Sequence, residues 1–214
     1  MYGTESKRGK LETMGIREKK AKETREAFLD ATIRMGAKYG LEKLTIKKIA
    51  EASPAVAATS YLYFKDKDDL MNQAFQKVDR SIATAFDHAL AELSGRETLQ
   101  QMAEKLWDVY FAKLMSDRDQ TLYYFAFRSS PRYNKEIQQA QLEYFKSLVE
   151  FAGVMNQKYH VFDHVEWIVF WNFLIDGTLM FAYRILIQDI PDTPENRANM
   201  RRMCVAGVLG VAGK

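Results

Sequence analysis

Apolar residues recur three or four positions apart along most of the chain, which is the spacing of one helical face. In residues 22–39 the stripe runs through Phe28, Ala31 and Met35. Four prolines and eleven glycines are too few for the many turns of a sheet protein. We therefore predict an all-α fold of about nine helices, three short ones in front and six longer ones behind. After residue 65 the predicted helices are 66–93, 97–115, 119–128, 131–158, 165–187 and 194–211.

Capping and turn residues mark the predicted boundaries. Aspartate or a hydroxyl residue precedes four of the predicted helices, and proline holds the first helical position in two of them. Glycine ends the first helix. The signals are Gly40, Asp66 with Asp69, Ser130 before Pro131, Asp163 with Glu166, and Thr193 before Pro194.

Charge is distributed unevenly along the chain. Residues 1–65 hold 14 Lys and Arg against 8 Asp and Glu, whereas residues 66–214 hold 17 against 20. A basic front on a slightly acidic body favours a polyanionic partner for the front, although a solvated helical face would carry the same charges. Residues 1–21 are polar, rich in Lys and Arg and nearly without apolar periodicity, so they predict a flexible basic arm.

Two short helices with a tight turn between them are predicted inside residues 45–64. Thr45 is a suitable N-cap for the first helix, and Ser53 before Pro54 ends it. These are the proportions of a helix-turn-helix, but an ordinary helical hairpin would share them. Lys47 and Lys48 near the start of the first helix could reach phosphates, and the small side chains of the second could approach base edges.

Several short motifs between residues 22 and 78 decide between these interpretations. They are Phe28-Leu29-Asp30-Ala31, Tyr39-Gly40, Leu44-Thr45-Ile46, Ile49-Ala50-Glu51, Thr59, Tyr61-Leu62-Tyr63-Phe64, and Lys67 followed by Leu70. Together they resemble the DNA-binding domain of the TetR/AcrR family of bacterial regulators. The resemblance implies an arm over 1–21, a helix-turn-helix domain over 22–68 and a helical effector-binding and dimerisation domain over 69–214. It also implies DNA contacts from Thr45, Lys47, Lys48, Ala55, Val56, Ala57, Ala58, Thr59, Ser60, Tyr61, Lys65 and Lys67.

The turn departs from the family pattern. Where relatives have a small residue, glycine, valine and serine, this chain has Ser53-Pro54-Ala55-Val56. Alanine also stands at position 57, which is often basic or polar in relatives. We therefore expect base reading to depend on thymine methyl groups and Thr59 rather than on bidentate Arg or Asn pairs. Phe64 is predicted to be buried against the core.

Aromatic residues concentrate in residues 97–189, where the resemblance implies an inducer pocket. Aromatics at helical spacing belong to a core more often than to a pocket. Three polar residues of the predicted helix 165–187 share one face: Asn172, Asp176 and Arg184. Asp176 and Arg184 could anchor a ligand or pair across a dimer interface, or the stripe could simply be solvated. The candidate pocket residues are Trp107, Tyr110, Phe111, Tyr123, Phe127, Trp167, Trp171, Asn172, Asp176 and Arg184.

The last two predicted helices, 165–187 and 194–211, resemble the dimer-forming pair of the family. Gly207 and Gly210 would let another helix approach closely. A homodimer would place two recognition helices about 34–36 Å apart, on successive major-groove faces of a palindromic operator in double-stranded DNA.

Other classes of protein are less consistent with the sequence. Cys204 is the only cysteine, which excludes an intrachain disulfide and fits a cytoplasmic protein. No signal peptide is recognised, and charged residues interrupt the apolar run at 165–187, so we expect neither export nor a membrane span. His160 and His164 have no third ligand near them in sequence, and neither a metal site nor a cofactor is expected. The sequence contains neither a nucleophile elbow nor a Gly-rich phosphate loop, so no motif of this kind indicates an enzyme.

We therefore expect a homodimeric repressor that a small, largely apolar effector releases from its operator. An activator of the same fold is the first alternative. A non-specific architectural DNA binder is the second, and the acidic body disfavours it.

Overall fold

The computed structural model describes residues 5–53, 60–163 and 165–212. Over these ranges the chain forms nine α-helices and no strand, so the all-α prediction is confirmed. The chain divides into two compact units, Met1–Ala74 and Phe75–Lys214.

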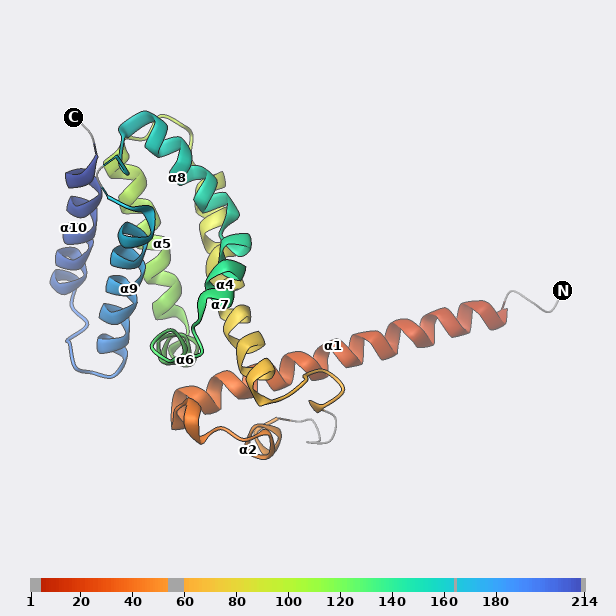
Figure 1. The fold of residues 1–214 in the computed structure, drawn as a ribbon. Coiled ribbons are helices and arrows are strands. Elements are labelled where there is room, and N and C mark those ends of the chain that lie inside the picture. Colours follow the sequence, from red (N-terminus) through yellow and green to blue (C-terminus); the bar gives the residue numbers. More distant parts are fainter. Residues whose placement is uncertain (1–4, 54–59, 164, 213–214) are drawn as a thin grey trace. The chain divides into compact units, whose positions relative to one another are not determined.

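The first unit contains α1 (Glu5–Tyr39), a short 3₁₀ helix η1 (Leu41–Lys43), α2 (Ile46–Glu51) and the beginning of α4 (Lys67–Ala91). Gly40 ends α1 with a φ of 81°, a left-handed conformation that favours glycine. Within this unit α2 packs against the C-terminal half of α1 (Figure 1). Phe64 is buried as predicted, with its ring edge-on to Phe28 at a centroid distance of 6.0 Å.

Most of the arm predicted for residues 1–21 is helical in the structure, because α1 begins at Glu5. Residues 5–21 contain no proline, and nine of the seventeen are Lys, Glu or Arg, which are strong helix formers. Such residues can extend a helix into solvent without an apolar face. Apolar periodicity alone therefore placed the start of this helix too late.

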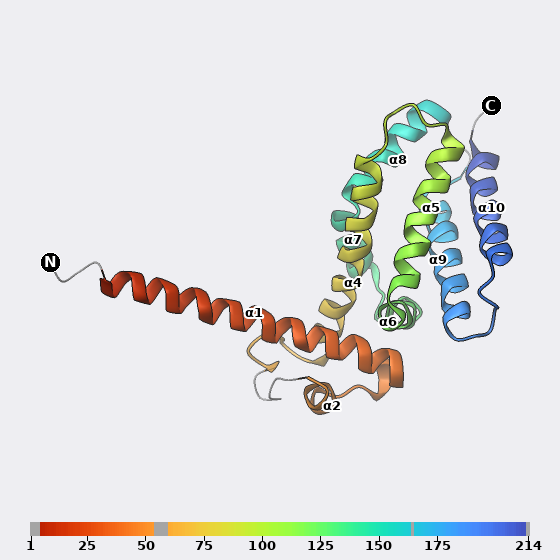
Figure 2. The same cartoon turned by 180° about the vertical axis from the view of Figure 1, so that it is seen from behind.

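The second unit continues α4 and adds six helices. They are α5 (Leu99–Ser116), α6 (Arg118–Arg128), α7 (Lys135–Tyr144), α8 (Lys146–Tyr159), α9 (Trp167–Leu186) and α10 (Pro194–Val211). Helices α5, α9 and α10 run side by side, with α10 and α4 on opposite sides of the unit (Figures 1 and 2). The core between them is largely aromatic, with the rings of Phe75, Tyr124 and Phe127 stacked on one another.

Two predicted helix starts are confirmed. Asp66 Oδ1 accepts a hydrogen bond from Asp69 N at 2.8 Å before α4. Thr193 Oγ1 accepts one from Asn196 N at 3.1 Å, with Pro194 at the first position of α10. Both signals are complete within four consecutive residues.

The predicted starts at residues 131 and 165 are wrong. α7 begins four residues later, where Asn134 is the N-cap, and the hydroxyl of Ser130 instead donates to Phe127 O. No side chain caps α9, because Asp163 contacts His160 rather than the helix start.

The single helix predicted over 131–158 is interrupted at Phe145, which separates α7 from α8. No proline or glycine marks this break. The Phe145 ring is buried edge-on to Phe86 and Trp171, so packing between distant segments sets the break.

Candidate DNA interface and ligand cavities

Helix α2 is held at both ends. At its start Thr45 Oγ1 accepts a hydrogen bond from Lys48 N at 3.2 Å, as predicted for an N-cap. At its end Arg34 of α1 donates to the carbonyl of Ala52 at 3.0 Å. Ile49 and Ala50 are buried beneath the helix. A helix of six residues would be marginal alone, so these contacts fix its orientation.

The predicted DNA contacts divide into three groups. Thr45, Lys47, Lys48, Tyr61 and Lys65 are exposed, and Lys67 is partly exposed at the first position of α4. Ser60, by contrast, is buried. The other predicted contacts lie outside the described residues: Ala55, Val56, Ala57, Ala58 and Thr59.

Leu62 was not among the predicted contacts, yet 78% of it is exposed beside the exposed Tyr61. An apolar side chain so open on a small unit is a candidate for contact with a partner surface. In the Tyr-Leu-Tyr-Phe stretch the aromatic residues were assigned roles from the sequence, and this leucine was not.

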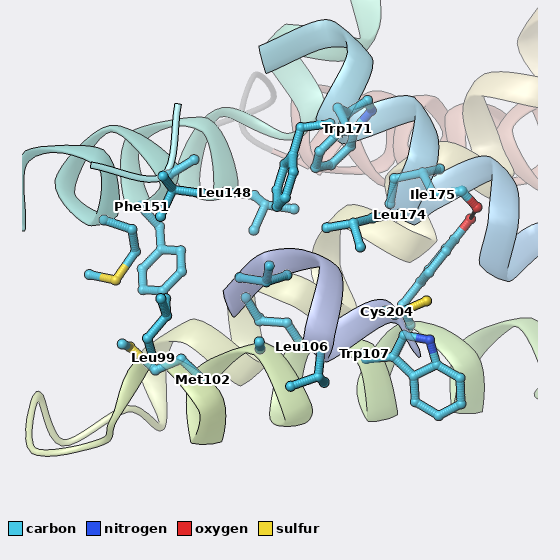
Figure 3. A pocket seen from close by; sticks show the side chains of 18 of the residues that line it. Leu99, Met102, Leu106, Trp107, Leu148, Phe151, Trp171, Leu174, Ile175 and Cys204 are labelled. Atoms are coloured by element: carbon cyan, nitrogen blue, oxygen red, sulfur yellow. Dashed lines mark hydrogen bonds between the residues drawn. The ribbon is translucent and has the colours of Figure 1, made fainter. Parts of the chain in front are cut away.

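An apolar cavity of about 130 Å³ lies inside the second unit. Side chains of α5, α8 and α9 point into it, with Cys204 of α10 at the wall (Figure 3). Its few polar groups bond to one another or to backbone, as when Tyr110 Oη donates to the carbonyl of Ile175 at 3.4 Å. Burial raises the pKa of the Cys204 thiol, which keeps the thiol neutral. The cavity therefore favours an uncharged, apolar guest.

A second, more polar cavity of about 180 Å³ shares part of its lining with the first. Tyr110, Trp167, Trp171 and Ile175 line both cavities. The second cavity also has side chains that can donate or accept hydrogen bonds, from α6, α7, α9 and the connection between α6 and α7, among them Arg128, Tyr133, Gln141, Asn172 and Asp176.

Six of the ten predicted pocket residues line one or both cavities: Trp107, Tyr110, Trp167, Trp171, Asn172 and Asp176. The other four do not. Tyr123 and Phe127 are fully buried core residues, and Phe111 stacks on Trp107 with its centroid 4.9 Å away. Arg184 is exposed and pairs with Asp189. Helical spacing could not separate core rings from lining rings, because both face inward.

A chain of hydrogen bonds lies behind the polar cavity. Asp79 Oδ1 accepts from Tyr124 Oη and from Gln141 Nε2, each at 2.8 Å. Gln141 in turn accepts from Tyr133 Oη. Burial raises the pKa of the Asp79 carboxyl to about 6, and the hydrogen bonds from Tyr124 and Gln141 oppose that rise. Sequence reasoning missed this network, whose members come from α4, α6, α7 and the connection between α6 and α7.

Arg128 joins the network to α9. Its Nη1 donates to Tyr133 Oη at 2.8 Å, while Nε and Nη2 lie 2.8 and 2.6 Å from Asp176 Oδ1. Asp176 is thus paired within its own chain. Asp176 and Arg184, predicted to share one face of this helix, have separate partners in the chain, Arg128 and Asp189.

Two further observations concern metal and membrane. Within the described ranges no cluster of three His, Cys, Asp or Glu side chains could hold a metal ion, and the His160 ring lies 3.0 Å from Asp163 Oδ2. His164 lies outside those ranges. Of the helices described, α9 alone is long and apolar enough to cross a membrane, yet it packs against α5, α6 and α10 and carries the Arg128 ion pair on Asp176.

Residues 28–74 match the model of a family described as bacterial regulatory proteins, tetR family. This part of the chain is therefore similar to TetR family regulators. The chain is 30% identical over 97 residues to the nicotine-responsive transcriptional repressor HdnoR of Paenarthrobacter nicotinovorans. The aligned region covers 44% of this chain and 46% of that relative, so the match spans about half of each.

The TetR fold also extends over the second unit. A TetR family transcription regulator from Marinobacter aquaeolei VT8 superposes with a TM-score of 0.76 at 23% identity, covering 92% of this chain and 100% of that one. FadR of Bacillus subtilis, in complex with stearoyl-CoA, superposes with a TM-score of 0.64 at 17% identity, covering 85% and 98%. At these identities the likeness shows the TetR fold alone.

Proposed function

We propose that this protein is a sequence-specific, DNA-binding transcriptional repressor. The observation that carries the proposal is the exposed face of the family-matched unit, where Lys47 and Lys48 stand on a helix fixed by Thr45 and Arg34. Ammonium groups beside a rigid helix start suit contacts with phosphates, which position a protein on DNA. The net positive charge of residues 1–65 supports the same partner.

The active form is a homodimer joined through α9 and α10. Both helices expose large apolar side chains: Ile168, Val169, Phe173 and Met180 on α9, and Met203 and Leu209 on α10. Apolar patches of this kind mark interaction surfaces, and a two-fold pair of such helices forms a four-helix bundle. The same interface would explain why α9 is apolar enough to resemble a membrane span.

A small, largely apolar effector binds in the 130 Å³ cavity and releases the DNA. An apolar cavity of comparable size in another protein stays dry and accepts benzene. HdnoR is named as nicotine-responsive and FadR holds stearoyl-CoA, so chains similar to this one respond to or bind small molecules with apolar parts. Release follows if the effector favours a spacing of the two DNA-binding units that no longer fits consecutive grooves.

DNA binding is tested with fluorescently labelled fragments from upstream of the protein's own and neighbouring genes, in competition with random DNA. We expect one fragment to bind at least about a thousandfold more tightly than random DNA. Lys48→Ala should weaken binding to all sequences and reduce the slope of log K against log salt by about one. Lys146→Ala, on the exposed surface of α8, is the matched control and should leave the slope unchanged.

Equal affinity for every fragment contradicts a specific regulator and favours the architectural alternative. Specific binding combined with increased transcription from the bound promoter identifies an activator instead.

The dimer is tested by sedimentation of variants with a charge on the proposed interface. Val169→Glu should give monomers and weaken operator binding. Val154→Glu places the same charge at a similarly exposed valine of α8, 55% against 59%, and should leave the dimer intact. A dimeric Val169→Glu variant would contradict this interface.

A further inference from the structure

Arg128 is a buried cation whose position does not depend on its anionic partner. Only 5% of its side chain is exposed. Its Nη1 donates to Tyr133, and its guanidinium carbon lies over the Tyr133 and Tyr124 rings, 4.5 and 5.7 Å from their centroids. Cation–π contacts and the hydrogen bond to Tyr133 hold the group in place from the interior side.

Asp176 can leave this pair more easily than Arg128 can. Its side chain is 51% exposed, so the carboxylate can return to water at low cost. The buried guanidinium, in contrast, would lose the one carboxylate that contacts it directly, which is costly in a protein interior even with the Asp79 carboxyl acting on it from behind the cavity. Any ligand that separates the pair must therefore bring an anion to Arg128.

The ion pair lines the polar cavity only, next to the side chains that line both cavities. Ile175, which is next to Asp176 in sequence, lines both cavities, and so do Tyr110 and Trp171. A guest that passes these side chains would have one part among apolar groups and the other beside the guanidinium. Within the polar cavity Arg128 is the buried cation, and its fork of N–H groups matches a carboxylate.

We propose that the effector is an amphipathic carboxylic acid whose carboxylate takes the place of Asp176 on Arg128 while its apolar part fills the neighbouring cavity. The proposal rests on the function proposed above for the apolar cavity. An amine could pair with Asp176 only by leaving Arg128 uncompensated, and an alcohol could not replace the charge. The exchange of one carboxylate for another keeps the buried cation neutralised throughout.

The protein supplies its own reporter for the test. All three tryptophans, Trp107, Trp167 and Trp171, line the apolar cavity. The full chain is titrated near neutral pH with octanoate, octan-1-ol and octylamine, which share one apolar chain and differ in the polar end. Tryptophan fluorescence and the thermal midpoint are measured together. We expect octanoate to bind about tenfold more tightly than the other two compounds, because a charge-assisted hydrogen bond is worth more than 1 kcal/mol.

Two variants separate the exchange from a merely structural ion pair. Asp176→Asn removes the competing charge, so octanoate should bind several-fold more tightly while octan-1-ol is unaffected. Arg128→Met should abolish the preference for the acid. Asp189→Asn is the matched control, because it breaks the exposed Arg184 pair outside both cavities and should change nothing. Far-UV circular dichroism and sedimentation check the fold and dimer of each variant.

The outcomes distinguish the two proposals. If octan-1-ol or octylamine binds as tightly as octanoate, the carboxylate inference is wrong and the apolar effector cavity stands. Weaker octanoate binding by a folded Asp176→Asn variant also overturns the inference. If none of the three compounds changes either signal, both the inference and the effector role of the cavity fail.

Discussion

Trp107 and Thr178 are joined across the wall of the apolar cavity by a buried hydrogen bond, with Nε1 of the indole donating to Oγ1 at 3.2 Å. Thr178 Oγ1 also lies 3.8 Å from the sulfur of Cys204. These polar atoms satisfy one another, which leaves an apolar surface for a guest. The cavity can therefore select by shape and apolar area, and discrimination by charge is left to the adjoining polar cavity.

Thr178→Val tests how much the Trp107–Thr178 hydrogen bond contributes to the stability of the protein. Valine has nearly the shape of threonine but leaves the indole N–H of Trp107 buried without an acceptor. We expect the free energy of unfolding to fall by about 1–3 kcal/mol, measured by urea denaturation. Thr84→Val is the control, because the exposed Thr84 hydroxyl bonds only to Arg80 O in its own helix. Equal losses in the two variants would show that the bond contributes nothing.

Asp79 should give the unfolding free energy a specific pH dependence. Its pKa is about 6 in the folded protein and near 4 in an unfolded chain, so the folded state holds the proton between these values. Stability from this group is therefore highest below about pH 4 and falls as pH rises through 6, with about 1 kcal/mol lost between pH 5 and pH 7. Asp79→Asn cannot ionise and should lack this loss. Urea midpoints of both proteins at the two pH values measure the difference, and identical changes would exclude Asp79 as its source.

Local signals predicted the parts of the fold that are decided locally. The start of α10 follows from Thr193 and Pro194, and the start of α4 follows from Asp66 and Asp69, because each cap forms between neighbours in sequence. The burial of Phe64 was also predictable from the family motif. In the same way, the exposed lysines of α2 were predicted from their place after the Thr45 cap.

What the sequence could not predict depends on distant contacts. The Arg128–Asp176 pair joins residues 48 positions apart, and the Asp79–Gln141 bond joins residues 62 apart. Nothing beside Arg128 in the sequence distinguishes it from a surface arginine. Periodicity placed Asp176 and Arg184 on one face but could not assign their partners, and this is why the polar cavity appeared only in the structure.

Gly207→Ala tests how closely α9 and α10 pack, and Gly153→Ala in α8 is the reference variant. A Cβ on Gly207 would lie 3.0 Å from the Phe173 ring of α9, whereas nothing lies within 4 Å of a Cβ on Gly153 in the middle of α8. Gly153→Ala should raise the free energy of unfolding by about 0.5–1 kcal/mol, since alanine favours a helix interior. In Gly207→Ala the displaced ring should cancel part or all of that gain. Thermal and urea unfolding measure both variants, and an equal gain would show that the ring moves freely.

Thr45 and Lys48 act on DNA in different ways, and salt dependence separates them. Thr45→Ala removes the cap of α2 and should cost about 1 kcal/mol in unfolding free energy. Because the frayed helix no longer presents its lysines in one orientation, operator affinity should fall while the number of neutralised phosphates stays almost the same. The salt slope of Thr45→Ala should therefore lie close to that of the unmodified protein, unlike the slope of Lys48→Ala. Thr45→Ser keeps the accepting hydroxyl and should recover most of both losses. If the serine variant binds as weakly as the alanine variant while remaining stable, the methyl group of Thr45 contributes to DNA binding, and capping alone does not account for its role.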